Sequence, residues 1–294
     1  PNMVELASRD VVSRSEQTEI DAGRGIDGCV LLDCRHLGEN LIKERLSQIY
    51  EIGLDFAGVD ITKEPIPIRP GMHYIMGGIK TDLNGSTIIP GLYAAGECAN
   101  VSVHGGNRLG ANSLLDTVVF GHRSGSHAAE QAKEMQYKPL DVNAYVAKEE
   151  ARIAKLVAQD NGERWAQIRM DLGKHMDEHF GVYRNEEGMR SLLESLSGYK
   201  QRYDKVILQD KGRIFNTDLI FTLELGFMLD CAEATVLSGL ERKESRGAHS
   251  RTDYPHRDDD NWLKHVLVTK TEAGPKLSHL PVTITKWQPE ERKY

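Results

Sequence analysis

The sequence predicts an α/β segment joined to an all-α domain. A short apolar run that ends in small residues, at residues 88–96, indicates a strand of an α/β sheet. From about residue 143 to residue 240, apolar residues recur at helical spacing and are interrupted by Gly and Asn, as in a helical bundle. A proline-rich stretch, KEPIPIRP at residues 63–70, separates the first part of the chain from the rest.

Length and composition restrict the class of protein. The 294 residues suffice for two domains of ordinary size or one large domain, and 39% hydrophobic with 28% charged residues indicates a globular chain. The net charge of -7, without a sustained basic stripe, argues against nucleic-acid binding. No apolar run approaches the ~20 residues that span a bilayer. The chain begins PNMVELASRD, without a signal pattern or an initiating Met, so we expect a piece of a longer protein.

The cysteines do not indicate a metal centre. They form no CxxC pair, so neither zinc nor an iron–sulfur cluster has a ligand set here. We expect reduced thiols, as in a cytosolic protein, at Cys29, Cys34, Cys98 and Cys231.

The first 62 residues predict two helices and a strand. A helix is expected from residue 1 to about residue 24, where Gly23 and Gly25 end it. VLLDCRHLG, at residues 30–38, suits a strand and turn, and Leu41–Ile52 suits a second amphipathic helix. Ion pairs on the helix surface explain the charged residues of the first helix better than a ligand does: Arg9, Asp10 and Arg14.

The central part combines a connector, a turn and a strand. Lys63–Pro70 holds three prolines, which fix φ and exclude a central strand or helix, so it is expected to be an extended domain seam. Thr81–Ser86 predicts a hairpin-type turn with Asn84-Gly85 at its tip. IIPGLYAAGE predicts a short strand with Glu97 at its C-terminal end.

The following region predicts helices at Val142–Gln159, Glu163–Phe180, Glu186–Tyr203 and Thr217–Leu240. An apolar stripe on the last helix is expected to face the bundle interior: Leu219, Ile220, Leu223, Phe227 and Ala234. His175 and His179 have the i, i+4 spacing of metal ligands, but no third ligand is near, so a solvated helix face is favoured.

The last segment predicts strands near Val266–Lys270 and Val282–Trp287. Its charged residues permit either a ligand site or a buried ion network, and residue types alone do not decide between these: Arg246, Arg251, Arg257 and Asp258–Asp260.

Residues 73–116 contain the densest mixture of Gly, His, Arg, Asn and Glu. Glu97 ends a predicted strand, where α/β sheets bind ligands, and a carboxylate there can accept two sugar hydroxyls. Asn112 or Ser113 is the predicted N-cap of the next helix, whose start would stabilise the negative charge that a flavin gains on reduction. Arg108 offers bidentate donors for a carboxylate, and His73 is a second candidate donor. Taken singly, His73 could be a hydrogen-bonded core residue and Arg108 could bind backbone carbonyls. Their occurrence together with Glu97 favours a binding site.

Several long phrases resemble the flavoprotein subunit of succinate dehydrogenase and fumarate reductase. They include HYIMGGIKTD, PGLYAAGE, SVHGGNRLGANSLLDTVVFG and ESRGAHSRTDYPHRDDDNWLKH, in the order of that family and along essentially the whole chain. L-Aspartate oxidase shares the HY-x-x-GG and NR-x-x-x-NSL phrases and remains an alternative. The Leu109-Gly110 pair and SRGAHSR look more like the dicarboxylate oxidoreductases.

The resemblance implies the second half of a doubly wound FAD-binding domain. It implies that His73 and Arg108 bind succinate or fumarate, that Glu97 binds the FAD ribose, and that Ser113 and Leu114, beside Asn112, contact the flavin ring. It also implies electron transfer to an iron–sulfur subunit and quinone, through membrane anchor subunits, at the cytoplasmic face of the inner membrane. The implied domains are the end of a capping domain (1–62), the FAD-binding part (63–137), a helical domain (138–245) and a small C-terminal domain (246–294).

Some family features are expected upstream of this chain. No G-x-G-x-x-G phrase follows a predicted strand, and the catalytic Arg of the family belongs to an RGEGG-like phrase expected just before Pro1. The chain alone is therefore expected to be inactive and to bind FAD weakly or not at all. A different class of function, a non-catalytic module that docks a partner subunit through its helical domain, is the other alternative.

Overall fold

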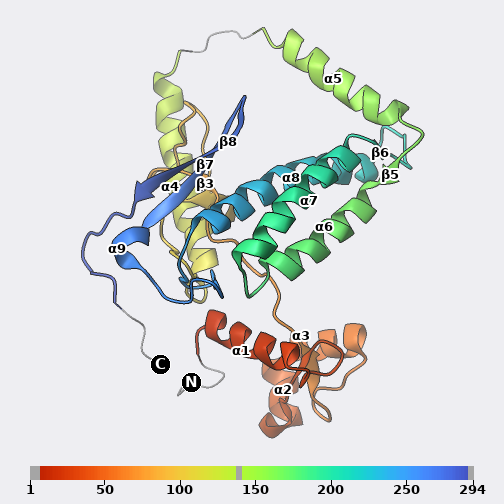
Figure 1. Cartoon of the computed structure of the whole chain (residues 1–294), viewed down its shortest axis with the longest axis vertical. Coiled ribbons are helices and arrows are strands. Elements are labelled where there is room, and N and C mark those ends of the chain that lie inside the picture. The colour runs from red at the N-terminus through yellow and green to blue at the C-terminus, as the bar shows by residue number, and fades with distance from the viewer. Residues whose placement is uncertain (1–6, 137–140, 291–294) are drawn as a thin grey trace. The chain divides into compact units, whose positions relative to one another are not determined.

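The computed structural model describes residues 7–136 and 141–290, which form two compact units (Figure 1). The first unit reaches to Tyr74 and the second comprises Ile75–Gln288. The four-domain division expected from the sequence stays a prediction.

The first unit is built from short helices and one two-stranded sheet. Helix α1 ends at Asp21, just before Gly23, as predicted. The predicted helix at 41–52 is interrupted at Leu46, whose φ of -123° leaves the helical region, so two helices form. The proline-rich connector contains a strand, because in a two-stranded ribbon Pro67 faces Leu31 without needing a second partner. The elements are α1 (Arg9–Asp21), β1 (Val30–Leu32), η2 (Arg35–Leu37), α2 (Glu39–Arg45), α3 (Ser47–Ile52), η3 (Gly53–Ala57) and β2 (Ile66–Ile68).

The second unit begins with a short parallel pair, β3 (Ile79–Lys80) and β4 (Ala99–Asn100). A turn is present in the predicted segment, but its tip differs: the Gly85 N–H donates to the Asp82 carbonyl at 3.1 Å, so Leu83 and Asn84 are the central residues. The predicted strand in IIPGLYAAGE is wrong. Its backbone is extended at Ala95, but a single bridge from Tyr93 to Ser86 is its only described ladder contact, so no strand develops. Glu97 therefore lies in the 3-10 turn η4 (Gly96–Cys98).

Helix α4 (Asn112–Glu134) starts as predicted, but its cap differs. The N-cap is Ala111, in the left-handed region at φ 63°, and it makes no side-chain cap hydrogen bond. Asn112 and Ser113 are therefore the first helical residues and not the cap. Apolar side chains near the start of α4 are largely exposed, with Leu114 at 72% and Val118 at 68% exposure.

Three helices form the core of the second unit, and Figure 1 shows α6, α7 and α8 alongside one another. Helix α7 has the predicted bounds, Glu186–Tyr203. Its start is determined by Asn185, whose side chain caps the helix by accepting a hydrogen bond from the Gly188 N–H at 2.8 Å. The helical elements here are α5 (Asn143–Ala158), α6 (Trp165–Phe180), α7 (Glu186–Tyr203) and α8 (Thr217–Glu241), with a short parallel pair of β5 (Glu163–Arg164) and β6 (Val206–Ile207).

The predicted inward stripe of α8 is wrong. Ile220 and Phe227 are 51% and 63% exposed, whereas Leu225, Leu229 and Val236 are buried against α6 and α7. Helix α8 is apolar on nearly every side, so periodicity does not single out one face.

The chain ends in helix α9 (Asp259–Trp262) and an antiparallel hairpin of β7 (Lys264–Thr271) and β8 (Gly274–Pro281). The strand predicted near residues 282–287 is wrong, because Gly274–Pro281 already pairs with the whole length of β7. Within residues 7–136 and 141–290, no helix is both long and apolar enough to cross a membrane.

Candidate functional site

The predicted site residues fall in both units. Glu97, Arg108 and the start of α4 belong to the second unit, and His73 is an exposed residue near the end of the first. The proximity of His73 to Arg108 therefore stays a prediction, while the arrangement of the others follows from the second unit alone.

Glu97 lies close to helix α4. A Cβ built on its neighbour Gly96 would lie 3.3 Å from the Thr117 hydroxyl, so η4 packs directly on the second turn of the helix. The Glu97 Oε1 accepts a hydrogen bond from the Ile75 N–H at 3.0 Å, which orients the carboxylate. The side chain is nevertheless exposed, so it is accessible to a ligand hydroxyl.

The start of α4 combines partial positive charge with an apolar surface. A 23-residue helix places that charge at its N-terminus, where no side-chain hydrogen bond forms a cap, although the Asn112 and Leu114 N–H groups donate to the Leu109 and Ala111 carbonyls at 3.2 Å each. The Leu114 side chain is exposed at this helix start. A planar ring with a developing negative edge fits this combination of groups.

Arg108 is half-buried in the loop between β4 and α4, and its Nη1 donates to the Leu109 carbonyl at 3.0 Å. The loop is attached to α4 through His104, whose Nε2 lies 3.2 Å from the Asp116 Oδ2, with both side chains nearly buried. We did not predict this pair from the sequence. Asp116 could have indicated the pair, because it is a carboxylate in the first turns of a helix whose neighbouring residues are apolar.

The charged residues near the C-terminus form an ion network, one of the two readings left open by the sequence. Arg251 is 1% exposed and Glu244 is fully buried. Glu244 accepts hydrogen bonds from Arg242 at 2.5 Å and from Arg246 at 2.7 and 2.9 Å. Arg246 also bonds Asp259 at 2.6 Å. These buried charges are paired, as a stable interior requires.

His249 lies within the same segment. Burial and the neighbouring Arg184 charge lower the pKa of His249 to about 3, so its imidazole is neutral near pH 7. Arg184 Nη1 lies 2.9 Å from His249 Nδ1, and burial lowers the pKa of that arginine to about 10.

The histidine pair on α6 does not form the predicted solvated face. His175 is half-buried and its Nδ1 lies 2.9 Å from the hydroxyl of buried Tyr199. The described residues include no cluster of His, Cys, Asp or Glu that would hold a metal ion.

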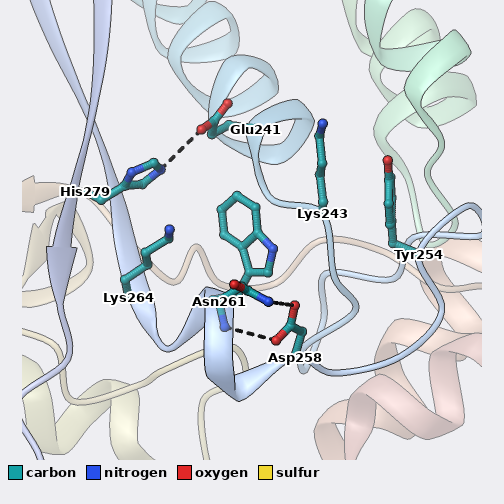
Figure 2. Close-up of a pocket in the computed structure, with 8 residues that line it drawn as sticks. Glu241, Lys243, Tyr254, Asp258, Asn261, Lys264 and His279 are labelled. Carbon is teal, nitrogen blue, oxygen red and sulfur yellow. Dashed lines mark hydrogen bonds and ion pairs between the residues drawn. The ribbon is translucent and has the colours of Figure 1, made fainter.

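A shallow pocket of about 580 Å³ lies elsewhere, between the end of α8, α9 and the hairpin (Figure 2). Its polar groups largely bind one another, since His279 pairs with Glu241 at 3.2 Å and Asn261 with Asp258 at 2.9 Å. The Lys264 ammonium lies 4.6 Å from the Trp262 ring centroid. None of His73, Glu97, Arg108 or Asn112–Leu114 lines this pocket, so its volume does not mark the candidate site.

The residues present fit part of an FAD molecule. Glu97 suits ribose hydroxyls, and the α4 start with Leu114 suits the flavin ring. These features match a nucleotide-bearing cofactor better than a metal ion, because the groups are a positively polarised helix start, one carboxylate and apolar surface.

Comparisons with known proteins agree with this assignment. Residues 2–114 match the model of an FAD binding domain, and residues 169–294 match that of the fumarate reductase flavoprotein C-terminus. The chain is 44% identical over 299 residues to a fumarate reductase flavoprotein subunit of Haemophilus influenzae, covering 99% of this chain and 50% of that protein. It is 46% identical to a succinate dehydrogenase flavoprotein subunit of Coxiella burnetii, covering 91% and 48% respectively.

A solved structure of Escherichia coli quinol fumarate reductase has a TM-score of 0.91 with 43% identity, covering 98% of this chain and 50% of that one. The chain thus spans about half the length of the curated relatives it matches.

Proposed function

We propose that the chain is part of a fumarate reductase or succinate dehydrogenase flavoprotein, and that it supplies half of an FAD-dependent site that interconverts succinate and fumarate. One observation carries the proposal. Arg108 lies in the loop before α4, and the His104–Asp116 pair attaches this loop to the helix. The start of the same helix suits a flavin ring. A carboxylate held by Arg108 would therefore lie close to the ring.

Each residue has a distinct part in this proposal. Arg108 binds one substrate carboxylate through two parallel N–H donors, and His73 donates to the same dicarboxylate. Glu97 accepts hydrogen bonds from the FAD ribose, and Asn112, Ser113 and Leu114 face the ring. Bound FAD supplies the two-electron hydride chemistry. The residues of this chain bind and orient the substrate and place positive charge beside its carboxylate.

We assign three further features to a part of the protein upstream of Pro1, since the relatives are about twice as long as this chain. These are the proton-transfer Arg, the dinucleotide fingerprint and the remaining substrate ligands. Electrons would pass to an iron–sulfur subunit, membrane anchor subunits and quinone at the cytoplasmic face of the inner membrane. One supporting likeness is to a quinol-fumarate reductase solved with menaquinol molecules, at 44% identity and a TM-score of 0.91.

The test is succinate-dependent dye reduction by the full-length flavoprotein with FAD. Arg108→Ala is expected to lower kcat/KM for succinate by about 100-fold or more, because two charge-assisted hydrogen bonds are each worth about 1.5–3 kcal/mol. Arg152→Ala is the control, since this arginine pairs with Glu149 on the exposed surface of α5. Undiminished activity of Arg108→Ala would contradict the proposal, and oxidation of aspartate in place of succinate would instead identify an L-aspartate oxidase.

A further inference from the structure

The loop that carries Arg108 contacts a segment far along the chain. The Ala248 N–H donates to the Gly106 carbonyl at 2.8 Å. Gly247 has a φ of +59°, and a Cβ built on it would lie 2.2 Å from the Gly106 oxygen and 2.4 Å from its carbonyl carbon. Only glycine permits so close an approach of two backbones. We call this the Gly106–Gly247 contact.

The segment on the far side of this contact, residues 244–251, is firmly anchored. At its start, buried Glu244 holds Arg246, and the Asp258 N–H donates to the same carboxylate at 2.9 Å. At its end, Arg251 donates from Nη1 to the Gly239 carbonyl at 3.1 Å, near the last turn of α8. The segment is therefore attached near its start to the residue that precedes α9 and at its end to the last turns of α8.

The loop with Arg108 is held from a second side as well. His104 joins it to Asp116 on α4, and Gly106 joins it to Gly247, so the loop is attached at two points within the four residues before Arg108. A shift of the Gly106 backbone would pass directly to the arginine, since only Asn107 lies between them.

We propose that Gly247 is a positioning residue for Arg108, and that the Gly106–Gly247 contact determines the position of the guanidinium that binds the substrate carboxylate. The proposal rests on the proposed function, because it concerns the same carboxylate-binding residue. It gives the SRGAHSR phrase a role in substrate binding through backbone contact, in addition to the ion network that its arginines form.

The test compares Gly247→Ala with the unsubstituted full-length flavoprotein in succinate-dependent dye reduction. An added methyl cannot fit 2.2 Å from the Gly106 oxygen, so the loop must shift. We expect a rise in KM for succinate on the order of 10- to 100-fold with a smaller change in kcat, because binding geometry is lost and not the hydride chemistry. A fall in kcat with KM unchanged would overturn the proposal.

Gly58→Ala is the matched control. Gly58 has a similar φ of +67°, but a Cβ there would meet nothing within 4 Å, so this variant carries the backbone strain without the displaced contact. Its KM for succinate is expected to equal that of the unsubstituted protein. An equal rise in KM in Gly58→Ala and Gly247→Ala would overturn the proposal, since strain alone would then explain it.

A double variant separates action through Arg108 from a general effect. If Gly247 acts through Arg108, adding Gly247→Ala to Arg108→Ala lowers kcat/KM no further, whereas multiplied losses overturn the proposal. Absence of succinate oxidation by the unsubstituted flavoprotein would refute the proposed function. Impaired Arg108→Ala with an unaltered Gly247→Ala would refute the positioning role alone.

Hydrogen exchange in the unsubstituted flavoprotein tests the contact even if Gly247→Ala does not fold. The Ala248 amide is expected to exchange slowly and to slow further with malonate, a dicarboxylate that cannot be dehydrogenated. An exchange rate that malonate leaves unchanged would overturn the coupling of this contact to the carboxylate site.

Discussion

Arg251 is the residue whose loss should destabilise the second unit most clearly. Its Nη1 donates to the carbonyl oxygens of Gly239, Leu240 and Arg242 at 3.1, 3.3 and 3.1 Å, where α8 ends. Its Nε and Nη2 each donate to Asp253 at 2.7 Å. One buried guanidinium therefore satisfies helix-end carbonyls and a carboxylate simultaneously.

Arg251→Met keeps the apolar stem and removes these donors. Breaking a buried ion pair costs about 3–5 kcal/mol, and the lower end applies because the Asp253 side chain is 30% exposed and can regain water. A loss of about 3 kcal/mol corresponds to a fall in Tm of roughly 6–12 °C for a unit of this size.

Urea unfolding followed by tryptophan fluorescence measures this loss. Arg257→Met is the matched control, because Arg257 pairs with Asp259 at a site where both side chains are about one-third exposed, and it should cost less than about 1 kcal/mol. The hydrogen bonds from Arg251 hold the pKa of Asp253 at about 2, below its unfolded value. The stabilisation is thus present above about pH 4 and is lost as the pH falls towards 2, and Arg251→Met should weaken this dependence, leaving the part due to the Glu186 N–H that also donates to Asp253. Equal free energies of unfolding for the two variants would refute the reasoning.

Two further predictions concern the same unit. Leu225→Ala, at a fully buried position, should lower the free energy of unfolding by about 2–5 kcal/mol in urea denaturation, whereas Phe227→Ala, at a 63% exposed position, should cost much less. The pKa of His249 is lowered to about 3 by burial and Arg184, so folding excludes the protonated form and stability should fall as the pH drops from about 6.5 towards 3. His249→Gln should flatten this slope in unfolding curves measured across that pH range, and an unchanged slope would show that His249 is not its source.

The helices of the second unit were predictable because their end signals are local. The Asn185 cap determines where α7 begins, so its bounds followed from nearby residues. Which side of α8 is buried was not predictable, because apolar residues surround that helix and the packing of α6 and α7 selects Leu225 over Phe227. Pairing with β7 likewise determines that β8 ends at Pro281, although the residues after it alternate like a strand.

The candidate site was predictable in its residue types but not in its supports. Arg108 and Glu97 stand out as charged groups among glycines, and the family resemblance assigned their roles. The α4 cap was mistaken because Ala111 adopts a left-handed conformation that its residue type does not favour. The Gly106–Gly247 contact joins residues far apart in the chain, and no local sequence pattern predicts such a contact.

The most direct test of the proposed dicarboxylate binding by Arg108 is a titration of the oxidised flavin spectrum with malonate, using the full-length flavoprotein. The unsubstituted protein should show a saturable spectral change, and Arg108→Ala should raise the Kd by about 100-fold, as expected for the loss of two charge-assisted hydrogen bonds. The same Kd in both proteins would show that Arg108 does not hold the substrate carboxylate and would contradict the account.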